Sequence, residues 1–94
     1  MKILENKVAI VTGAGRNIGK SIALALAKEG AKITVVDVNE TDGNNVVNEI
    51  KELGSDAIFI NCDISKSDEV DKMVKNTVDT FGKLDILVNN AGIT

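Results

Sequence analysis

The sequence contains no histidine and no tyrosine among its 94 residues. These two side chains are frequent proton donors and acceptors in enzymes, so a mechanism that needs either of them cannot run on this chain alone. A histidine-ligated metal site is excluded as well, and one cysteine is too few for a thiolate site. The absences therefore point away from metal chemistry and from His- or Tyr-dependent proton transfer.

Disulfides, membrane spans and polyanion-binding patches are missing too. Cys62 is a single cysteine, which fits a reducing, cytoplasmic setting, and we expect it to be a small apolar strand residue. No run approaches the roughly 20 apolar residues of a transmembrane helix, and the N-terminus lacks the apolar core of a signal peptide. The net charge of −3 and the absence of a polybasic cluster argue against nucleic acid and membrane surfaces as partners.

What the sequence does contain is an alternation of short apolar, β-branched runs with amphipathic segments. The runs predict four strands, at residues 8–11, 33–36, 57–60 and 84–88. The segments between them carry apolar residues at helical spacing and are long enough to connect parallel strands. The expected order is therefore β-α-β-α-β-α-β within one domain spanning residues 1–94.

The ends of the helices also carry recognisable signals. Asn39 is expected to cap the second helix, and Ser65 or Ser67 the third. Gly43 weakens the first turn of the second helix, which leaves its start loosely defined. Left-handed glycines are expected to end the three helices, at Gly30, Gly54 and Gly82. The inward face of the third helix is expected to contain Val70, Met73, Val74, Thr77, Val78 and Phe81.

Right-handed crossovers between these strands predict an α/β fold, a doubly wound, Rossmann-like parallel sheet with strand order 3-2-1-4. Ligands of such sheets bind at the carboxyl ends of the strands, beside the point where the strand order reverses. The unusual residues of this chain all fall at those ends, at 13–19, Asp37, Asp63 and 89–92. Their shared position predicts a nucleotide site.

The loop at residues 12–19 joins the first strand to the first helix and permits two interpretations. Glycines let the backbone approach a phosphate, and the helix N-terminus aims N–H groups at it. The strict G-x-G-x-x-G pattern fails, because the last glycine is Gly19. The phosphate-loop pattern G-x-x-x-x-G-K-S matches residues 14–21 in part, because Ala14 stands where that pattern has its first glycine. Lys20 and Ser21 would then serve an NTPase, although an ordinary exposed helical turn is the favoured interpretation.

Asp37 closes the second strand and favours a dinucleotide. A carboxylate at that position can accept both hydroxyls of an adenosine ribose and would repel a 2′-phosphate. The following Val38 supplies no positive charge for such a phosphate. The sequence therefore predicts NAD as the cofactor in preference to NADP.

With Thr12-Gly13, Gly19, Asp37, Asp63 and the segment 89–92 in register, the sequence resembles the short-chain dehydrogenase/reductase family. Within that family it resembles the bacterial 3-oxoacyl-carrier-protein reductases and related alcohol and sugar dehydrogenases. The resemblance covers the whole chain, and the motifs are specific as a set. It implies an oxidoreductase that moves hydride between a nicotinamide and a carbonyl or hydroxyl carbon.

The resemblance also implies a contact with the nicotinamide dinucleotide for each matching residue. Asp37 matches the acid that binds the ribose, and Asp63 the acid that meets the adenine amino group, with the Ile64 backbone beside it. Asn90 matches a residue that braces the sheet. The pyrophosphate loop is matched by Gly13, Gly15, Arg16, Asn17, Ile18 and Gly19. The segment along the cofactor's other ribose is matched by Asn89, Ala91 and Gly92.

Two departures from the family pattern qualify these roles. Asn17 stands where the family has glycine or alanine, in a turn whose left-handed conformation asparagine tolerates better than other non-glycine residues. The family's catalytic Ser and Tyr-x-x-x-Lys have no counterpart here, since they lie beyond the position of Thr94. We therefore expect a cofactor-binding N-terminal portion without the catalytic portion.

Such a portion would expose its fourth strand as a sheet edge. An apolar edge at residues 84–88 tends to pair with other chains, so self-association is expected, and the family is typically homo-oligomeric. Two alternatives to the oxidoreductase remain open. One is a non-catalytic nucleotide-binding module, and the other is the phosphate-loop NTPase.

Overall fold

The computed structural model of the chain describes residues 2–90 and confirms the predicted order of elements. Four parallel strands form one sheet in the order β3-β2-β1-β4, as the crossover rule predicted. The strands are β1 (Val8–Thr12), β2 (Lys32–Asp37), β3 (Ala57–Asn61) and β4 (Ile86–Val88). The helices are α1 (Asn17–Lys28), α2 (Glu40–Glu52) and α3 (Ser67–Phe81).

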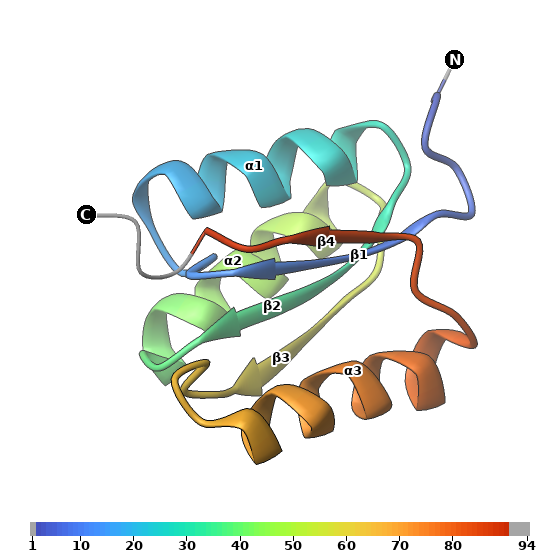
Figure 1. Ribbon diagram of the computed structural model, residues 1–94. Helices are drawn as coiled ribbons and strands as arrows, with labels where there is room; N and C mark the ends of the chain where they lie inside the picture. The colour runs from blue at the N-terminus through green and yellow to red at the C-terminus, as the bar shows by residue number, and fades with distance from the viewer. Residues whose placement is uncertain (1, 91–94) are drawn as a thin grey trace.

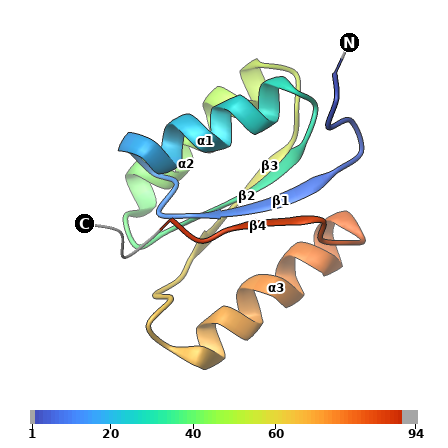
Figure 2. The same ribbon diagram turned by 45° about the horizontal axis from the view of Figure 1, so that its top comes forward.

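The sheet lies between two helical layers, with α1 and α2 on one face and α3 on the other (Figures 1 and 2). All five residues of β1 are buried, because this strand has a neighbour on each side and helices on both faces. The core under α1 and α2 contains Ala9, Val11, Ala23, Ala27, Ile33, Val35, Val46 and Ile50. The smaller core under α3 contains Ile10, Val36, Cys62 and Met73.

The helix ends follow the predicted glycine signals. Gly30, Gly54 and Gly82 all adopt left-handed backbone angles, with φ of 99°, 91° and 86°. Asn39 caps α2 as predicted, since its Oδ1 accepts a hydrogen bond of 2.9 Å from the Asp42 N–H. Gly43, which the sequence predicted to weaken the first turn of α2, lies inside the helix. Glycine is needed there because a side chain would collide with the ring of Phe59.

The start of α3 corrects the sequence-based prediction. Lys66 is its N-cap residue, and its side chain makes no capping bond. Ser65 is engaged elsewhere, because its hydroxyl donates to the Asp63 carboxylate at 2.7 Å. Ser67 is already the first helical residue. Ser65, which we expected to cap the helix, therefore forms a short-range hydrogen bond to the preceding Asp63 in place of the capping bond.

The α3 side of the sheet is less completely covered than the sequence predicted. Val78 was expected to face inward, but 39% of it is exposed. The fourth strand is also shorter than residues 84–88, because it pairs with β1 only from Ile86 to Val88. Since α3 packs over β1 and β2, it leaves Leu87 on β4 54% exposed. None of the helices between residues 2 and 90 has the length and apolarity that crossing a bilayer requires.

Candidate nucleotide-binding site

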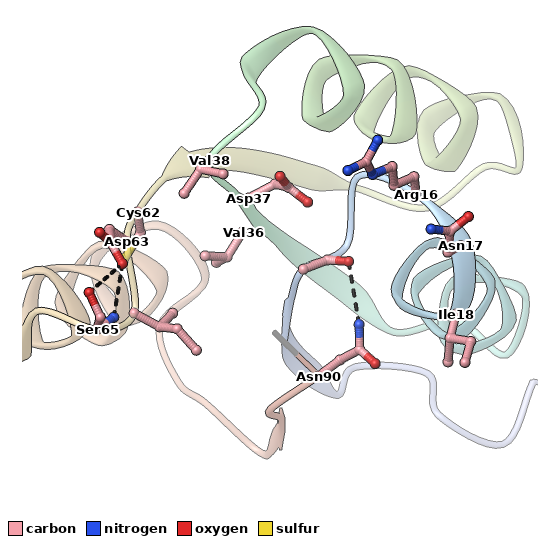
Figure 3. Close-up of a pocket in the computed structure, with 12 residues that line it drawn as sticks. Arg16, Asn17, Ile18, Val36, Asp37, Val38, Cys62, Asp63, Ser65 and Asn90 are labelled. Carbon is pink, nitrogen blue, oxygen red and sulfur yellow. Dashed lines mark hydrogen bonds between the residues drawn. The ribbon is translucent and has the colours of Figure 1, made fainter. Parts of the chain in front are cut away.

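A cavity of about 730 Å³ opens at the carboxyl ends of the strands, where the sequence placed the site (Figure 3). This volume falls within the roughly 300–1,000 Å³ of typical small-molecule sites. Arg16, Asn17 and Ile18 lie on one side of the cavity, and Asp63 and Ser65 lie on the other. The full lining comprises Gly13, Arg16, Asn17, Ile18, Val36, Asp37, Val38, Cys62, Asp63, Ile64, Ser65 and Asn90.

The loop between β1 and α1 depends on two left-handed residues and one very close approach. Gly13 has φ of 63°, and Asn17 has φ of 57°, so the asparagine does adopt the conformation that the loop demands. At Gly19, a Cβ would lie 2.7 Å from Asn90 Nδ2 and closer still to the Gly13 carbonyl oxygen. The glycine thus lets α1 begin directly against the loop, which brings its first N–H groups to the cavity.

The N-terminus of α1 is suited to an anion. Its N-cap residue, Arg16, makes no side-chain capping bond, and the first turn contains no acidic residue. The first N–H groups of a helix have no intrahelical partner, and the positive end of the helix dipole lies beside them. With the Arg16 side chain exposed at the cavity, this end of the site can accept a phosphate.

Asp37 is fixed in position by two backbone bonds before any ligand arrives. Its Oδ2 accepts from the Gly15 N–H at 2.9 Å, and its Oδ1 accepts from the Asn39 N–H at 2.9 Å. A Cβ on residue 15 would lie 2.8 Å from that Oδ2, so only glycine permits this contact. Each oxygen keeps a lone pair for another donor, which is the arrangement that a pair of ribose hydroxyls requires.

Asp63 and its neighbours form the opposite side of the cavity. Asp63 Oδ1 accepts two bonds from Ser65, from the N–H at 3.0 Å and from the hydroxyl at 2.7 Å. These bonds favour the charged carboxylate and lower the pKa of Asp63 below its ordinary value. Burial raises the pKa of the Cys62 thiol, and the Glu69 and Asp63 carboxylates raise it further. Cys62 is therefore neutral and buried, as the sequence predicted, but it lies directly after β3 and not within a strand.

The end of β4 is attached to the glycine loop through Thr12. Its hydroxyl accepts from the Asn90 N–H at 2.9 Å and lies 3.3 Å from both the Val88 carbonyl and Asn89 Oδ1. Asn90 Nδ2 donates to the Gly13 carbonyl at 3.5 Å, so this side chain braces β4 against the loop as expected (Figure 3). The candidate residues Ala91 and Gly92 lie outside the residues that the structure describes.

Most of the predicted site residues that the structure describes line this one cavity. Gly15, Gly19 and Asn89 do not line it, but Gly15 donates to Asp37 and Gly19 permits the close approach of α1. Lys20 and Ser21 are not part of the lining, and Lys20 Nζ lies 3.0 Å from Glu49 on α2. That ion pair directs the lysine away from the cavity and removes the support for a phosphate-loop lysine.

Sequence reasoning did not assign five lining residues to the cofactor: Val36, Val38, Cys62, Ser65 and Asn90. Of these, Asn90 was predicted only to brace the sheet. Two of them carried a signal. Val38 is 68% exposed directly after an acidic strand end, and an apolar residue there suits the face of a base. Ser65 follows Asp63 by two residues, which is the spacing of a turn in which a carboxylate accepts from the backbone. Val36 and Cys62 looked like ordinary core residues.

Known proteins that are similar to this chain include dehydrogenases and reductases. Residues 7–94 match the family model described as short chain dehydrogenase. The 3-oxoacyl-[acyl-carrier-protein] reductase of Staphylococcus epidermidis is 50% identical over 90 residues, which is 95% of this chain and 37% of the reductase. The 7alpha-hydroxysteroid dehydrogenase of Escherichia coli is 46% identical over 89 residues, 95% of this chain and 35% of that enzyme.

A solved structure of similar sequence identity shares the fold of this chain. It is a 7alpha-hydroxysteroid dehydrogenase complexed with NADH and 7-oxo glycochenodeoxycholic acid, 46% identical, with a TM-score of 0.93. The match covers 96% of this chain and 35% of that one. The chain thus spans about a third of the length of the curated relatives it matches.

Proposed function

The chain belongs to the short-chain dehydrogenase/reductase family, and we propose that residues 1–94 bind the nicotinamide dinucleotide of an oxidoreductase, NAD in preference to NADP. The observation that carries this proposal is a single cavity that joins the uncapped start of α1, the braced Asp37 and the Asp63 carboxylate. These are the three kinds of group that a pyrophosphate, a ribose and an adenine need. The bound nicotinamide would donate or accept the hydride.

Each part of the dinucleotide has matching groups in the chain. The N–H groups at the start of α1 would hold the pyrophosphate, with Arg16 nearby. The two oxygens of Asp37 would accept the ribose hydroxyls, and Asp63 with the Ile64 backbone would take the adenine edge. The contacts proposed from the family pattern comprise Gly13, Gly15, Arg16, Asn17, Ile18, Gly19, Asp37, Asp63, Ile64, Asn89, Ala91 and Gly92.

The charges around Asp37 support NAD. The first turn of α2 adds two acidic residues, Glu40 and Asp42, just beyond the strand that ends at Asp37. A 2′-phosphate on the ribose would bring its negative charge against the Asp37 carboxylate, which two backbone N–H groups hold in place. A carboxylate so held cannot turn away to relieve the repulsion. The ribose with two free hydroxyls is the better fit.

The chemical step needs groups that these 94 residues do not contain. The family's proton donor is a tyrosine, and the sequence has none. We therefore assign this portion the binding and orientation of the cofactor, and we leave the acid–base step to the Ser, Tyr and Lys of the family pattern. The substrate, a carbonyl or hydroxyl compound, belongs to that same catalytic portion.

Titrations of the protein with NADH and NADPH test the proposal. The protein should bind NADH more tightly, and Asp37→Ala should lower the NADH-to-NADPH affinity ratio by about tenfold or more, the worth of a hydrogen bond to a charged group. Asp71→Ala, which removes an exposed carboxylate on α3 away from the cavity, is the matched control and should leave the ratio unchanged. An equal ratio in wild type and Asp37→Ala would contradict the preference for NAD.

A further inference from the structure

The two oxygens of the Asp63 carboxylate have different surroundings. Oδ1 accepts both the N–H and the hydroxyl of Ser65, whereas Oδ2 has no hydrogen-bond partner within residues 2–90. Asp63 lines the cavity, and its bonds to Ser65 lie on the same side of it (Figure 3). The carboxylate is therefore held through one oxygen and keeps the other for a donor from the ligand.

A second residue holds the backbone of the same segment. Glu69, from the first turn of α3, accepts the Asp63 N–H on its Oε1 at 3.0 Å. Its main-chain carbonyl lies 3.4 Å from Cys62 Sγ, which donates to it. Glu69 thus contacts two successive residues of the β3–α3 loop (residues 62–66). Ser65 controls the carboxylate of Asp63, and Glu69 controls the peptide from which that carboxylate projects.

These contacts are additional to what the loop needs in order to turn. The backbone closes the turn by itself, because the Lys66 N–H donates to the Asp63 carbonyl at 3.1 Å. The Ser65 hydroxyl adds nothing to that closure, since its bond ends on the side-chain oxygen of Asp63. The arrangement orders a side chain at the wall of a cavity, which is how binding groups are preorganised.

We propose that Ser65 and Glu69 are positioning residues that hold the free Oδ2 of Asp63 in place to accept the amino group of an adenine. This inference rests on the proposed function, since it takes the ligand to be an adenine dinucleotide. Ser65 lines the cavity, but its N–H and its hydroxyl both donate to Asp63 Oδ1, and Glu69 does not line the cavity. Both act through Asp63, so their loss should affect the recognition of the adenine amino group and leave the rest of the dinucleotide bound as before.

The test compares NADH with reduced nicotinamide hypoxanthine dinucleotide, in which a carbonyl oxygen replaces the amino group. The protein should bind NADH about tenfold more tightly, because the analogue loses a hydrogen bond to a charged group and opposes its oxygen to the carboxylate. Ser65→Ala and Glu69→Ala should each lower this discrimination by about threefold or more, since a displaced binding group loses most of its directional bond.

Matched variants separate positioning from general effects on α3. Asp68→Ala removes the other acid of the first turn, and Ser67→Ala removes a serine of similar exposure, and both should keep the wild-type discrimination. Glu69→Gln loses the same charge as Glu69→Ala but keeps an oxygen acceptor for the Asp63 N–H. It should therefore retain discrimination if the hydrogen bond, and not the charge, positions Asp63.

The outcomes distinguish the inference from the function beneath it. The wild-type protein and both alanine variants could bind NADH and prefer it to the hypoxanthine analogue by the same factor. That result would overturn the positioning role of Ser65 and Glu69 and leave the proposed function intact. A lower melting temperature in these variants without lower discrimination would also overturn it, since that is the behaviour of purely structural residues. Failure of the wild-type protein to bind NADH would overturn the proposed function and the inference together.

Discussion

Asn17 occupies a backbone position that glycine would adopt at no cost. Its φ of 57° lies in the left-handed region, where L-residues other than glycine lose roughly 1–2 kcal/mol, and asparagine somewhat less. Its side chain is exposed and makes no hydrogen bond or ion pair within residues 2–90, so it contributes little packing. Substitutions at this position therefore report on the backbone of the loop between β1 and α1.

Asn17→Ala should lower the free energy of unfolding by about 1 kcal/mol, because alanine bears the full left-handed cost. Asn17→Gly should leave stability equal or slightly higher, since relief of strain is partly offset by the greater freedom of the unfolded chain. Urea denaturation of the two variants checks the order. Equal destabilisation by both would contradict the assignment of a left-handed turn at residue 17.

Asp37 illustrates what the sequence reveals about a residue and what it does not. Its position at the end of β2 was predicted from the strand pattern, and its role from the chemistry of a carboxylate there. Its bond to Gly15 was not predicted, because the two residues approach across separate strand ends. That approach depends on how β1 and β2 align, which is a property of the pair and not of either residue.

At the scale of elements, a hydrogen bond to a charged carboxylate connects the amino ends of β1 and β4. The Asp85 carboxylate accepts the Val8 N–H at 2.9 Å, and Lys83 Nζ lies 3.3 Å from the same oxygen. The Val8 bond, and after it the lysine, lower the pKa of Asp85 below its ordinary value of 3.8. A carboxyl whose pKa is lower in the folded state stabilises the fold at pH values above the unfolded value. That stabilisation is lost as the pH falls through the folded pKa.

Asp85→Asn should therefore lower stability at neutral pH and make the remaining stability less sensitive to acid. Urea denaturation at pH 7, 5 and 3 measures both effects. Because the pKa of Asp63 is lowered too, some loss of stability below about pH 4 should persist in the variant. An acid profile identical to that of wild type would contradict a role for the Asp85 charge in joining β1 to β4.

The ends of the elements show which local signals are decisive. Glycine ended each helix as predicted, because a left-handed stop is a property of the glycine backbone itself. Ser65 did not cap α3, because a serine hydroxyl can bond to several local groups and this one donates to the Asp63 carboxylate. Val78 was predicted to be buried on the inward face of α3 but is 39% exposed. How much of that face is buried depends on which strands the helix packs against.

At the scale of the whole molecule, the two faces of the sheet differ in cover. Two helices pack on one face, whereas α3 alone lies on the other (Figure 2). The strands that α3 chiefly contacts are β1 and β2, and not the edge strand β4. Leu87 pairs with the buried Ile10 and shares its face, yet 54% of it is exposed. Val78 adds a second exposed apolar side chain from α3 itself. Exposed apolar surface beside an open strand edge favours association.

We therefore predict that the 94-residue chain self-associates in solution. Leu87→Lys should reduce the association measured by sedimentation velocity, because it places a charge on the open edge strand. Ile3→Lys, which changes a side chain that is 73% exposed and lies before β1, is the matched control and should leave association unchanged. A monodisperse wild-type monomer would contradict the prediction.

We propose above that the cavity at the carboxyl ends of the strands binds a nicotinamide dinucleotide, from the start of α1 to Asp63. Amide chemical shifts of the ¹⁵N-labelled protein, titrated with NADH, test it most directly. We expect the amide signals of residues 13–19 and those around Asp37 and Asp63 to shift. The signals of Gly54 and Ser55, which line a separate cavity, should not move. Shifts centred on Gly54 and Ser55, or no shifts at saturating NADH, would contradict it.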